Sequence, residues 1–282
     1  MPDGRGKYRR LIGIQLRISL LTAMQYRWDF LAQGLMQLLW MALSVMPLYI
    51  AYKARAVAQG SSLTATDIGG WGFYPATMVF ATFYLLKAAL DGAINPSLIG
   101  VVDHIRKGTL DFVLLKPADA QFLVSTAKFE LWHVIDGLAA AVLVGVASQR
   151  FSHSGAPVGA FSASAILASL LLLLCGALLL YAVWLLVVCA AFYVVRIDNL
   201  SYLFTSVFDF ARWPRGVFRG ALHVVFTYVL PLVVMTSFPV DALLGRLRPQ
   251  EALWALVLTG LLLLLSRWTF RRALANYTSA SS

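Results

Sequence analysis

Long, uncharged hydrophobic runs recur along this sequence, and they constrain its fold more than any other feature. The run from Ile166 to Val195 contains no Asp, Glu, Lys or Arg. A helix crosses the roughly 30 Å hydrocarbon layer of a membrane with about 20 mostly apolar residues. Hydrophobic residues make up 60% of the 282 positions and charged residues only 13%, which is more apolar surface than one soluble core could bury. The sequence therefore predicts an all-α integral membrane protein.

These runs predict one transmembrane domain over residues 1–282 with six spanning helices. Before the first run, apolar and polar residues recur at helical spacing among arginines, which predicts an amphipathic helix lying in the membrane interface. The expected segments are the interfacial helix over 1–28, spans over 30–52 and 71–90, a cytoplasmic coupling loop over 91–119, spans over 120–148, 166–195 and 198–212, a re-entrant or outer segment over 219–240, and a last span over 252–270.

The region from 198 to 240 admits two arrangements. Pro231 and Pro239 interrupt its second apolar stretch, and proline-broken backbone at membrane depth is tolerated where it packs in protein or lines a cavity. In the first arrangement 198–212 crosses the membrane and 219–240 dips back without crossing. In the alternative, 197–219 stays on the cytoplasmic surface and 220–240 is the fifth span. Both arrangements give six crossings.

Basic residues favour an orientation with both termini in the cytoplasm. In that orientation thirteen Lys and Arg residues lie on the cytoplasmic side and eight outside, as the positive charge of cytoplasmic loops predicts. Five of the eight outer residues lie between Arg212 and Arg248. The net charge of +10 is spread over short loops, which favours contact with membrane lipids over nucleic acid. No cleavable export signal is evident, so we expect the mature chain to begin near Met1.

The polar segment between the second and third spans carries the clearest motif. Residues 98–105 predict a short amphipathic helix, and Arg106 to Gly108 predict its end. A second apolar patch follows and ends at Lys116 and Pro117. Such a segment presents apolar residues to a partner at the membrane surface.

The run RKGTLDFVLLKP in this segment resembles the cytoplasmic loop of bacterial ABC-2 type transporter permeases, in which the pattern R-x-G-x-[LF]-D-x-x-L-x-[KR]-P recurs. Two other places agree with this resemblance: QYRWDF before the first span, and the proline-containing stretch from Phe208 to Pro239. The resemblance covers nearly the whole chain. It implies an ABC-2 fold like that of type V exporters, with a cytoplasmic coupling helix and a re-entrant outer segment between helices 5 and 6, in a bacterial inner membrane.

The resemblance also implies a division of labour between subunits. The chain has no G-x-x-x-x-G-K-[ST] phosphate loop, so we expect no catalytic residues and no cofactor in it, and ATP and Mg²⁺ in a partner ABC ATPase dimer. A second permease subunit, identical or related, completes the transporter. The residues expected to couple to the ATPase are Ile105, Arg106, Lys107, Gly108, Leu110, Asp111, Leu114, Lys116 and Pro117.

The fifth span is rich in aromatic residues, for which the resemblance suggests a role in an apolar cavity for the substrate. From the residues alone, we expect these aromatic side chains to face lipid or to pack between helices. The resemblance adds the hypothesis that a hydrophobic or amphipathic compound passes along Trp40, Tyr202, Phe204 and Phe208.

Other function classes find less support. His133 lies three residues from both Glu130 and Asp136, which places the three on one face of a helix. A di-iron bundle needs a second such motif, so we expect a structural polar cluster and no metal. A polytopic enzyme or scaffold acting on lipid would need convergent His, Ser and carboxylate residues at one depth, whereas the four histidines are spread over loops and both membrane faces.

Overall fold

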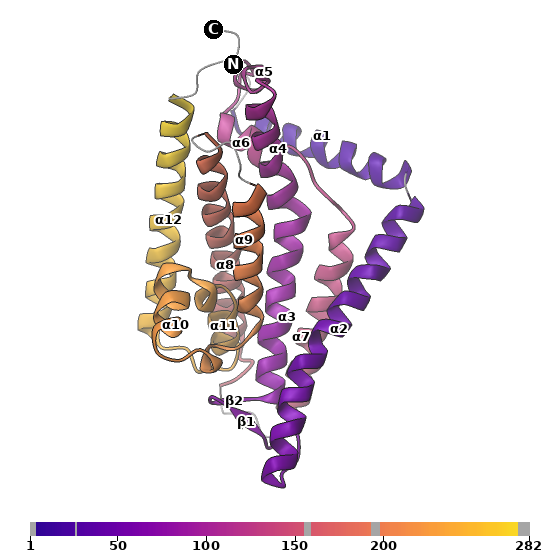
Figure 1. Ribbon diagram of the computed structural model, residues 1–282, viewed down its shortest axis with the longest axis vertical. Helices are drawn as coiled ribbons and strands as arrows, with labels where there is room; N and C mark the ends of the chain where they lie inside the picture. Colours follow the sequence, from indigo (N-terminus) through magenta and orange to yellow (C-terminus); the bar gives the residue numbers. More distant parts are fainter. Residues whose placement is uncertain (1–3, 26, 155–158, 193–197, 276–282) are drawn as a thin grey trace.

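A computed structural model describes residues 4–25, 27–154, 159–192 and 198–275, which form a helical bundle with one small hairpin (Figure 1). The α-helices are α1 Gly4–Gln25, α2 Arg27–Gln59, α3 Phe73–Ala89, α4 Asn95–Arg106, α5 Asp111–Leu114, α6 Ala120–Ser125, α7 His133–His153, α8 Ala163–Cys189, α9 Asp198–Phe208, α10 Ala221–Val224, α11 Leu232–Leu243 and α12 Pro249–Ala275. Strands β1 Asp67–Ile68 and β2 Trp71–Gly72 pair antiparallel. Short π-helical turns are η1 Leu90–Ile94 and η5 Val225–Val229, and 3₁₀ turns are η2 Ala190–Phe192, η3 Asp209–Arg212 and η4 Arg215–Val217.

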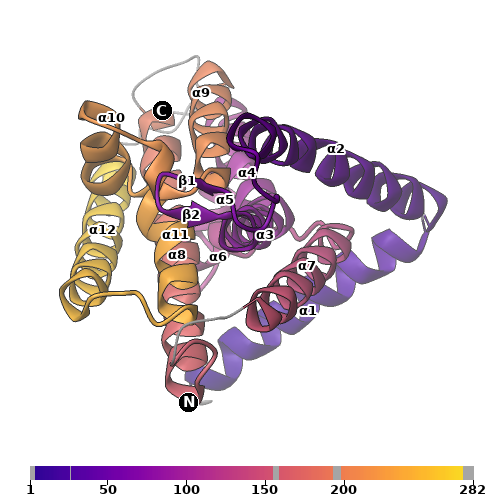
Figure 2. The ribbon, with the colours of Figure 1, turned by 90° about the horizontal axis from the view of Figure 1, so that it is seen from below.

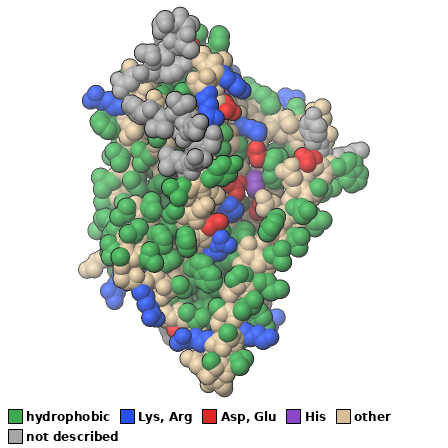
Figure 3. All heavy atoms as spheres, viewed as in Figure 1, with side chains coloured by type: hydrophobic (Ala, Val, Ile, Leu, Met, Phe, Trp, Pro, Cys, Tyr) green, Lys and Arg blue, Asp and Glu red, His purple; other side chains and the backbone are tan. Residues whose placement is uncertain are grey.

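The bundle has two distinct ends. Helices α5 and α6 and the end of α12 lie at one end, which we call the tip end, and the β1–β2 hairpin lies at the other, the hairpin end (Figure 1). Helix α1 lies across the tip end at a large angle to α2, as an interfacial helix would (Figures 1 and 2). Hydrophobic side chains cover the middle of the molecule, and most Lys and Arg side chains gather toward its two ends (Figure 3).

Five helices are long and apolar enough to cross a membrane, and a bent helix pair brings the number to six if it is counted as one span. The five are Trp28–Gln59, Phe73–Arg106, His133–His153, Ala163–Cys189 and Pro249–Ala275. The first of them is longer than the predicted span over 30–52. Helix α9, in the region of the predicted fifth span, has only 11 residues, which is too short to cross alone.

The second span differs from its prediction because it does not end before the polar segment. Helix α3 continues through η1 into α4, so residues 98–105 are the last turns of a 34-residue helix rather than a separate amphipathic helix. The π-turn has a local cause. Pro96 has no backbone N–H and leaves the carbonyl of Gly92 without its helical donor, while Asn95 N–H donates to Leu90 O one residue farther back.

The third span also differs from the prediction of a continuous helix over 120–148. Residues 126–132 separate α6 from α7 and run beside the π-turn. Glu130 N–H donates to the free carbonyl of Gly92 at 2.8 Å, and Ser97 Oγ donates to Lys128 O at 2.6 Å. The break is stable because its backbone N–H and C=O groups form hydrogen bonds with the Gly92 carbonyl of the π-turn and with the hydroxyl of Ser97.

The bent pair lies in the hairpin half, with α11 inside the bundle and α10 at its edge (Figures 1 and 2). Helix α10 with η5 and helix α11 meet at 86°, and α11 packs against α8 and α3 with almost every side chain buried. Thr236 Oγ1 donates to Ala211 O at 2.9 Å, and Arg215 N–H donates to Ser237 Oγ at 3.2 Å. These bonds hold residues 211–215 at the hairpin end, opposite α5.

Candidate functional site

The coupling segment forms a projecting tip at the end of α4. Gly108 has a φ of +63°, a conformation that favours glycine. Gly108 N–H donates to Ile105 O at 3.2 Å, and Thr109 N–H donates to His104 O at 2.9 Å. This pair of bonds is the Schellman termination, so the predicted helix end at Arg106 to Gly108 is confirmed. The chain then reverses into the short helix α5.

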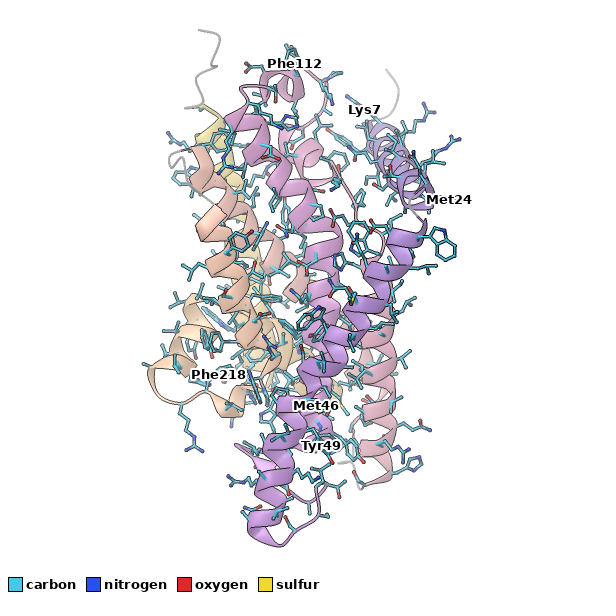
Figure 4. The ribbon with its side chains drawn as sticks, turned by 45° about the vertical axis from the view of Figure 1, so that its right-hand side comes forward. Lys7, Met24, Met46, Tyr49, Phe112 and Phe218 are labelled. Carbon is cyan, nitrogen blue, oxygen red and sulfur yellow. The ribbon has the colours of Figure 1, made fainter. Side chains whose placement is uncertain are left out.

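Of the large apolar residues in the tip, Leu110 is buried in the bundle, whereas Phe112 and Leu115 are exposed. Leu110 is 0% exposed and belongs to the main hydrophobic core, whereas Phe112 and Leu115 are 69% and 80% exposed. Phe112 lies at the far end of the molecule, away from the bundle (Figure 4). The motif pattern includes Leu110 and Leu114 but neither Phe112 nor Leu115, so the sequence did not predict these two as docking residues. The signal that could have found them is their spacing of three residues, which places them on one side of a helical turn.

The other predicted coupling residues are divided by burial. Those exposed at the tip are Arg106, Lys107, Leu114, Lys116 and Pro117, and those partly buried are Ile105, Gly108 and Asp111. Ile105 packs against the core with Leu110. A partner that binds the tip would therefore meet the exposed set together with Phe112 and Leu115.

The tip is fastened to other helices of the bundle. Asp119 Oδ2 accepts from Arg267 Nη2 on α12 at 2.9 Å, and Arg267 Nη1 donates to Gln121 Oε1 at 3.1 Å. Gln121 Nε2 donates to Tyr181 Oη on α8 at 2.9 Å. The Tyr8 ring of α1 meets Phe122 edge-on at 4.7 Å. Residues 119–122, which follow the tip, therefore contact α1, α8 and α12.

Asp119 is held ionised at this junction. Partial burial raises the pKa of its carboxyl group, but the hydrogen bonds from Arg267 and from Phe122 N–H, with the charges of Arg267 and Arg271, lower it more. The net result is a pKa below the ordinary value for Asp. The carboxylate also caps the first turn of α6 through Phe122 N–H at 3.1 Å.

The four residues predicted for the substrate pathway lie in different environments. Phe204 packs edge-on against Trp184 at 5.1 Å, and Phe208 packs against Phe83 at 5.1 Å. Both phenylalanines are buried within this chain, as packing between helices requires, and their part in a substrate pathway stays a prediction. Trp40 on α2 and Tyr202 on α9 are exposed and remain available to a substrate, a lipid or another subunit.

The polar cluster of the third span does not form as one helical face. Helix α7 begins at His133, so Glu130 lies in the preceding break. His133 Nδ1 binds Asp136 Oδ2 at 2.7 Å, while Glu130 Oε1 pairs with Lys128 Nζ at 2.8 Å. In the part of the chain that the structure describes, no group of three or more His, Cys, Asp or Glu side chains is placed to hold a metal ion.

Comparison with known proteins gives one result. A family model described as "ABC-2 family transporter protein" matches residues 36–281. No curated protein matches the chain, and no solved structure matches it. The family match begins within α2 and covers every later element, including the tip and the bent pair.

Proposed function

The chain belongs to the ABC-2 family of transporter proteins, and from that premise we propose that it is the permease subunit of an exporter driven by a separate ATPase. The ATPase binds as a dimer and supplies ATP and Mg²⁺. Our chain supplies the membrane path and the surface on which the ATPase docks. A hydrophobic or amphipathic compound is the proposed substrate.

The exposed apolar pair on the tip is the observation that carries this proposal. Phe112 and Leu115 project from a short helix that Leu110 anchors in the core and that Asp119 ties to α12. Exposure of large apolar side chains to water costs free energy, and these two project beyond the apolar middle of the protein. The cost is removed when a partner covers them. A groove on an ATPase subunit that receives this short helix would cover them.

In the proposed orientation the tip end faces the cytoplasm of a bacterial cell. Both termini then lie inside, α1 lies in the inner interface, and the bent pair is re-entrant from the outer face. Helix α9 with η3 completes the sixth crossing, since α9 is shielded by its packing on α3 and α8. The long helix α2 has a mostly exposed apolar surface, which suits lipid on one side and a second permease subunit on another.

Two experiments test the proposal. The tagged chain, purified in mild detergent, is expected to bring down a soluble ABC ATPase and to raise its ATP turnover on reconstitution. Recovery of the folded chain without an ATPase, under conditions that preserve the complex of a known ABC-2 transporter, would contradict the function. Single cysteines at Lys107 and at Ser61, in a background without Cys175 and Cys189, test orientation: an impermeant thiol reagent added to intact cells should label only position 61.

A further inference from the structure

A polar pocket at the hairpin end has a charge pattern that the proposed function does not use. It encloses about 530 Å³ between the β1–β2 hairpin, η4, the start of the bent pair, and the link from α11 to α12. Figure 2 looks onto this end of the molecule. The hairpin and η4 are in close contact, because a Cβ added to Gly69 would collide with the backbone of Gly216. This contact forms a firm wall of the pocket.

Both carboxylates of the pocket converge on one arginine. Arg215 Nη1 donates to Glu251 Oε1 at 2.8 Å, and Arg215 Nε lies 3.2 Å from Asp241 Oδ2. Glu251 Oε2 is also occupied, because it accepts from Arg248 N–H at 3.1 Å at the start of α12. Two carboxylates thus face Arg215, and Glu251 also caps the start of α12.

Two other arginines of the pocket form no ion pair within 4 Å. Among the residues that the structure describes, the side chain of Arg248 has no such partner, and the guanidinium of Arg246 lies over the Phe151 ring at 5.9 Å and acts on the Asp241 carboxylate only from a longer distance. The ring of His223 lies in the same pocket. Guanidinium groups bind phosphate and carboxylate in a two-point geometry, so the pocket has a place for an anion that the protein itself does not fill.

The position of these arginines on the chain points the same way. Arg215, Arg246 and Arg248 belong to the basic cluster that runs against the enrichment of positive charge in cytoplasmic loops. Basic residues in short outer loops disfavour the proposed orientation. We therefore infer that these arginines have a function at the outer face of the protein.

An adjoining cavity extends the pocket toward apolar surface. It measures about 290 Å³, shares Arg215, His223, Arg248 and Glu251 with the pocket, and continues between η5 and α12. Its walls include Thr227 and Trp254, whose Oγ1 and Nε1 atoms are buried without a hydrogen-bond partner. A buried polar atom without a partner costs free energy, and a ligand with polar groups next to an apolar chain would satisfy both.

We propose that the pocket binds the anionic headgroup, a phosphate or a carboxylate, of an amphiphile whose apolar part lies in the adjoining cavity. Arg248 and Arg246 hold the anion, and Thr227 and Trp254 bind the polar groups that follow it. This inference rests on the proposed function only in placing the hairpin end at the outer membrane surface. The headgroup belongs either to a lipid of the outer leaflet or to the transported compound on its way out.

Binding of amphiphiles with one common tail tests the site. Radiolabelled dodecyl phosphate is titrated into the purified chain in dodecyl maltoside, with unlabelled dodecylphosphocholine as competitor. We expect saturable binding of dodecyl phosphate and weak competition by the zwitterion. Arg248→Gln with Arg246→Gln should weaken binding at least tenfold, and Arg248→Lys should weaken it less. Arg150→Gln, at an exposed arginine of α7 outside the pocket, should leave binding unchanged, and circular dichroism checks that each variant keeps its helices.

Further arms of the experiment separate the two sources of the headgroup. Displacement of dodecyl phosphate by phosphatidylglycerol but not by phosphatidylcholine, each added in mixed dodecyl maltoside micelles, would support a lipid of the outer leaflet. Binding of dodecyl phosphate that phosphatidylglycerol does not displace would support the transported compound, and displacement by inorganic phosphate as strong as that by dodecyl phosphate itself would overturn the role of the apolar part. Equal binding by the double variant and the wild type, or an equal loss in Arg150→Gln, would overturn the proposal. No ATPase is present in this assay, so a failure here is distinct from a failure of the chain to bind and stimulate its ATPase.

Discussion

Truncating the exposed pair of the tip should weaken the ATPase complex without harming the fold. Complete burial of a Phe or Leu side chain is worth about 1.5–3 kcal/mol. Phe112 is 69% and Leu115 is 80% exposed before docking, so about 1–2.4 kcal/mol is available from each by the same scale. Part of that gain is offset by the ordering of side chains on association. We therefore expect Phe112→Ala with Leu115→Ala to cost about 2 kcal/mol, which is roughly a thirtyfold higher Kd.

The measurement is biolayer interferometry of the detergent-purified permease against its ATPase subunit. Leu179→Ala is the matched control, because Leu179 is a fully buried leucine of α8 outside the tip. This truncation should lower the free energy of unfolding by about 2–5 kcal/mol while the Kd of the folded protein changes little. A double variant that binds within threefold of the wild type would refute the assignment of the tip as the docking surface, as would a larger effect on Kd from Leu179→Ala.

Three further perturbations probe the fold and the junctions around the site. Ser97→Ala removes the hydroxyl that donates to Lys128 O and accepts from Lys128 N–H. We expect the free energy of unfolding to fall by about 1–3 kcal/mol, measured by thermal unfolding. An unchanged melting temperature would show that Ser97 does not stabilise the break in the third span. Phe204→Ala should destabilise the protein by about 3–5 kcal/mol through its lost packing on Trp184; altered transport preference at wild-type stability would support its predicted role in the substrate pathway. Asp119→Asn should lower the melting temperature at pH 7, because the lowered pKa of Asp119 stabilises the folded state above the ordinary carboxyl pKa. The difference should vanish as the pH falls through that lowered value, and a difference that persists in strong acid would show that charge is not its cause.

Periodicity and composition predicted the helical membrane architecture, since a chain this apolar can bury its long hydrophobic runs in few places other than a membrane. The family was predicted from the resemblance of motifs such as RKGTLDFVLLKP. The run from Ile166 to Val195 corresponds to α8 over Ala163–Cys189, and its last residues lie outside those described. The helix stop at Gly108 was predictable because a positive φ there favours a residue without a side chain.

What sequence reasoning missed depends on contacts between distant segments. A proline such as Pro96 inside a helix usually kinks or ends it. Here the helix continues, because Glu130 N–H binds the Gly92 carbonyl that Pro96 leaves without a donor. Likewise, the apolar letters of the tip do not reveal that Leu110 faces the core while Phe112 faces outward. The convergence of Asp241 and Glu251 on Arg215 joins residues that are 26 and 36 positions apart from it, and no local pattern predicts it.

The helix from Phe73 to Arg106 joins the two ends of the bundle. Its 34 residues span about 50 Å at the usual helical rise. It begins two residues after Trp71, which lines the arginine pocket, and ends at the turn that presents Phe112. Under the proposed function, an ATPase bound at the tip would act on one end of this helix while the anionic headgroup is held beside its other end. A shift of the helix along its axis would then couple nucleotide binding to release of the headgroup.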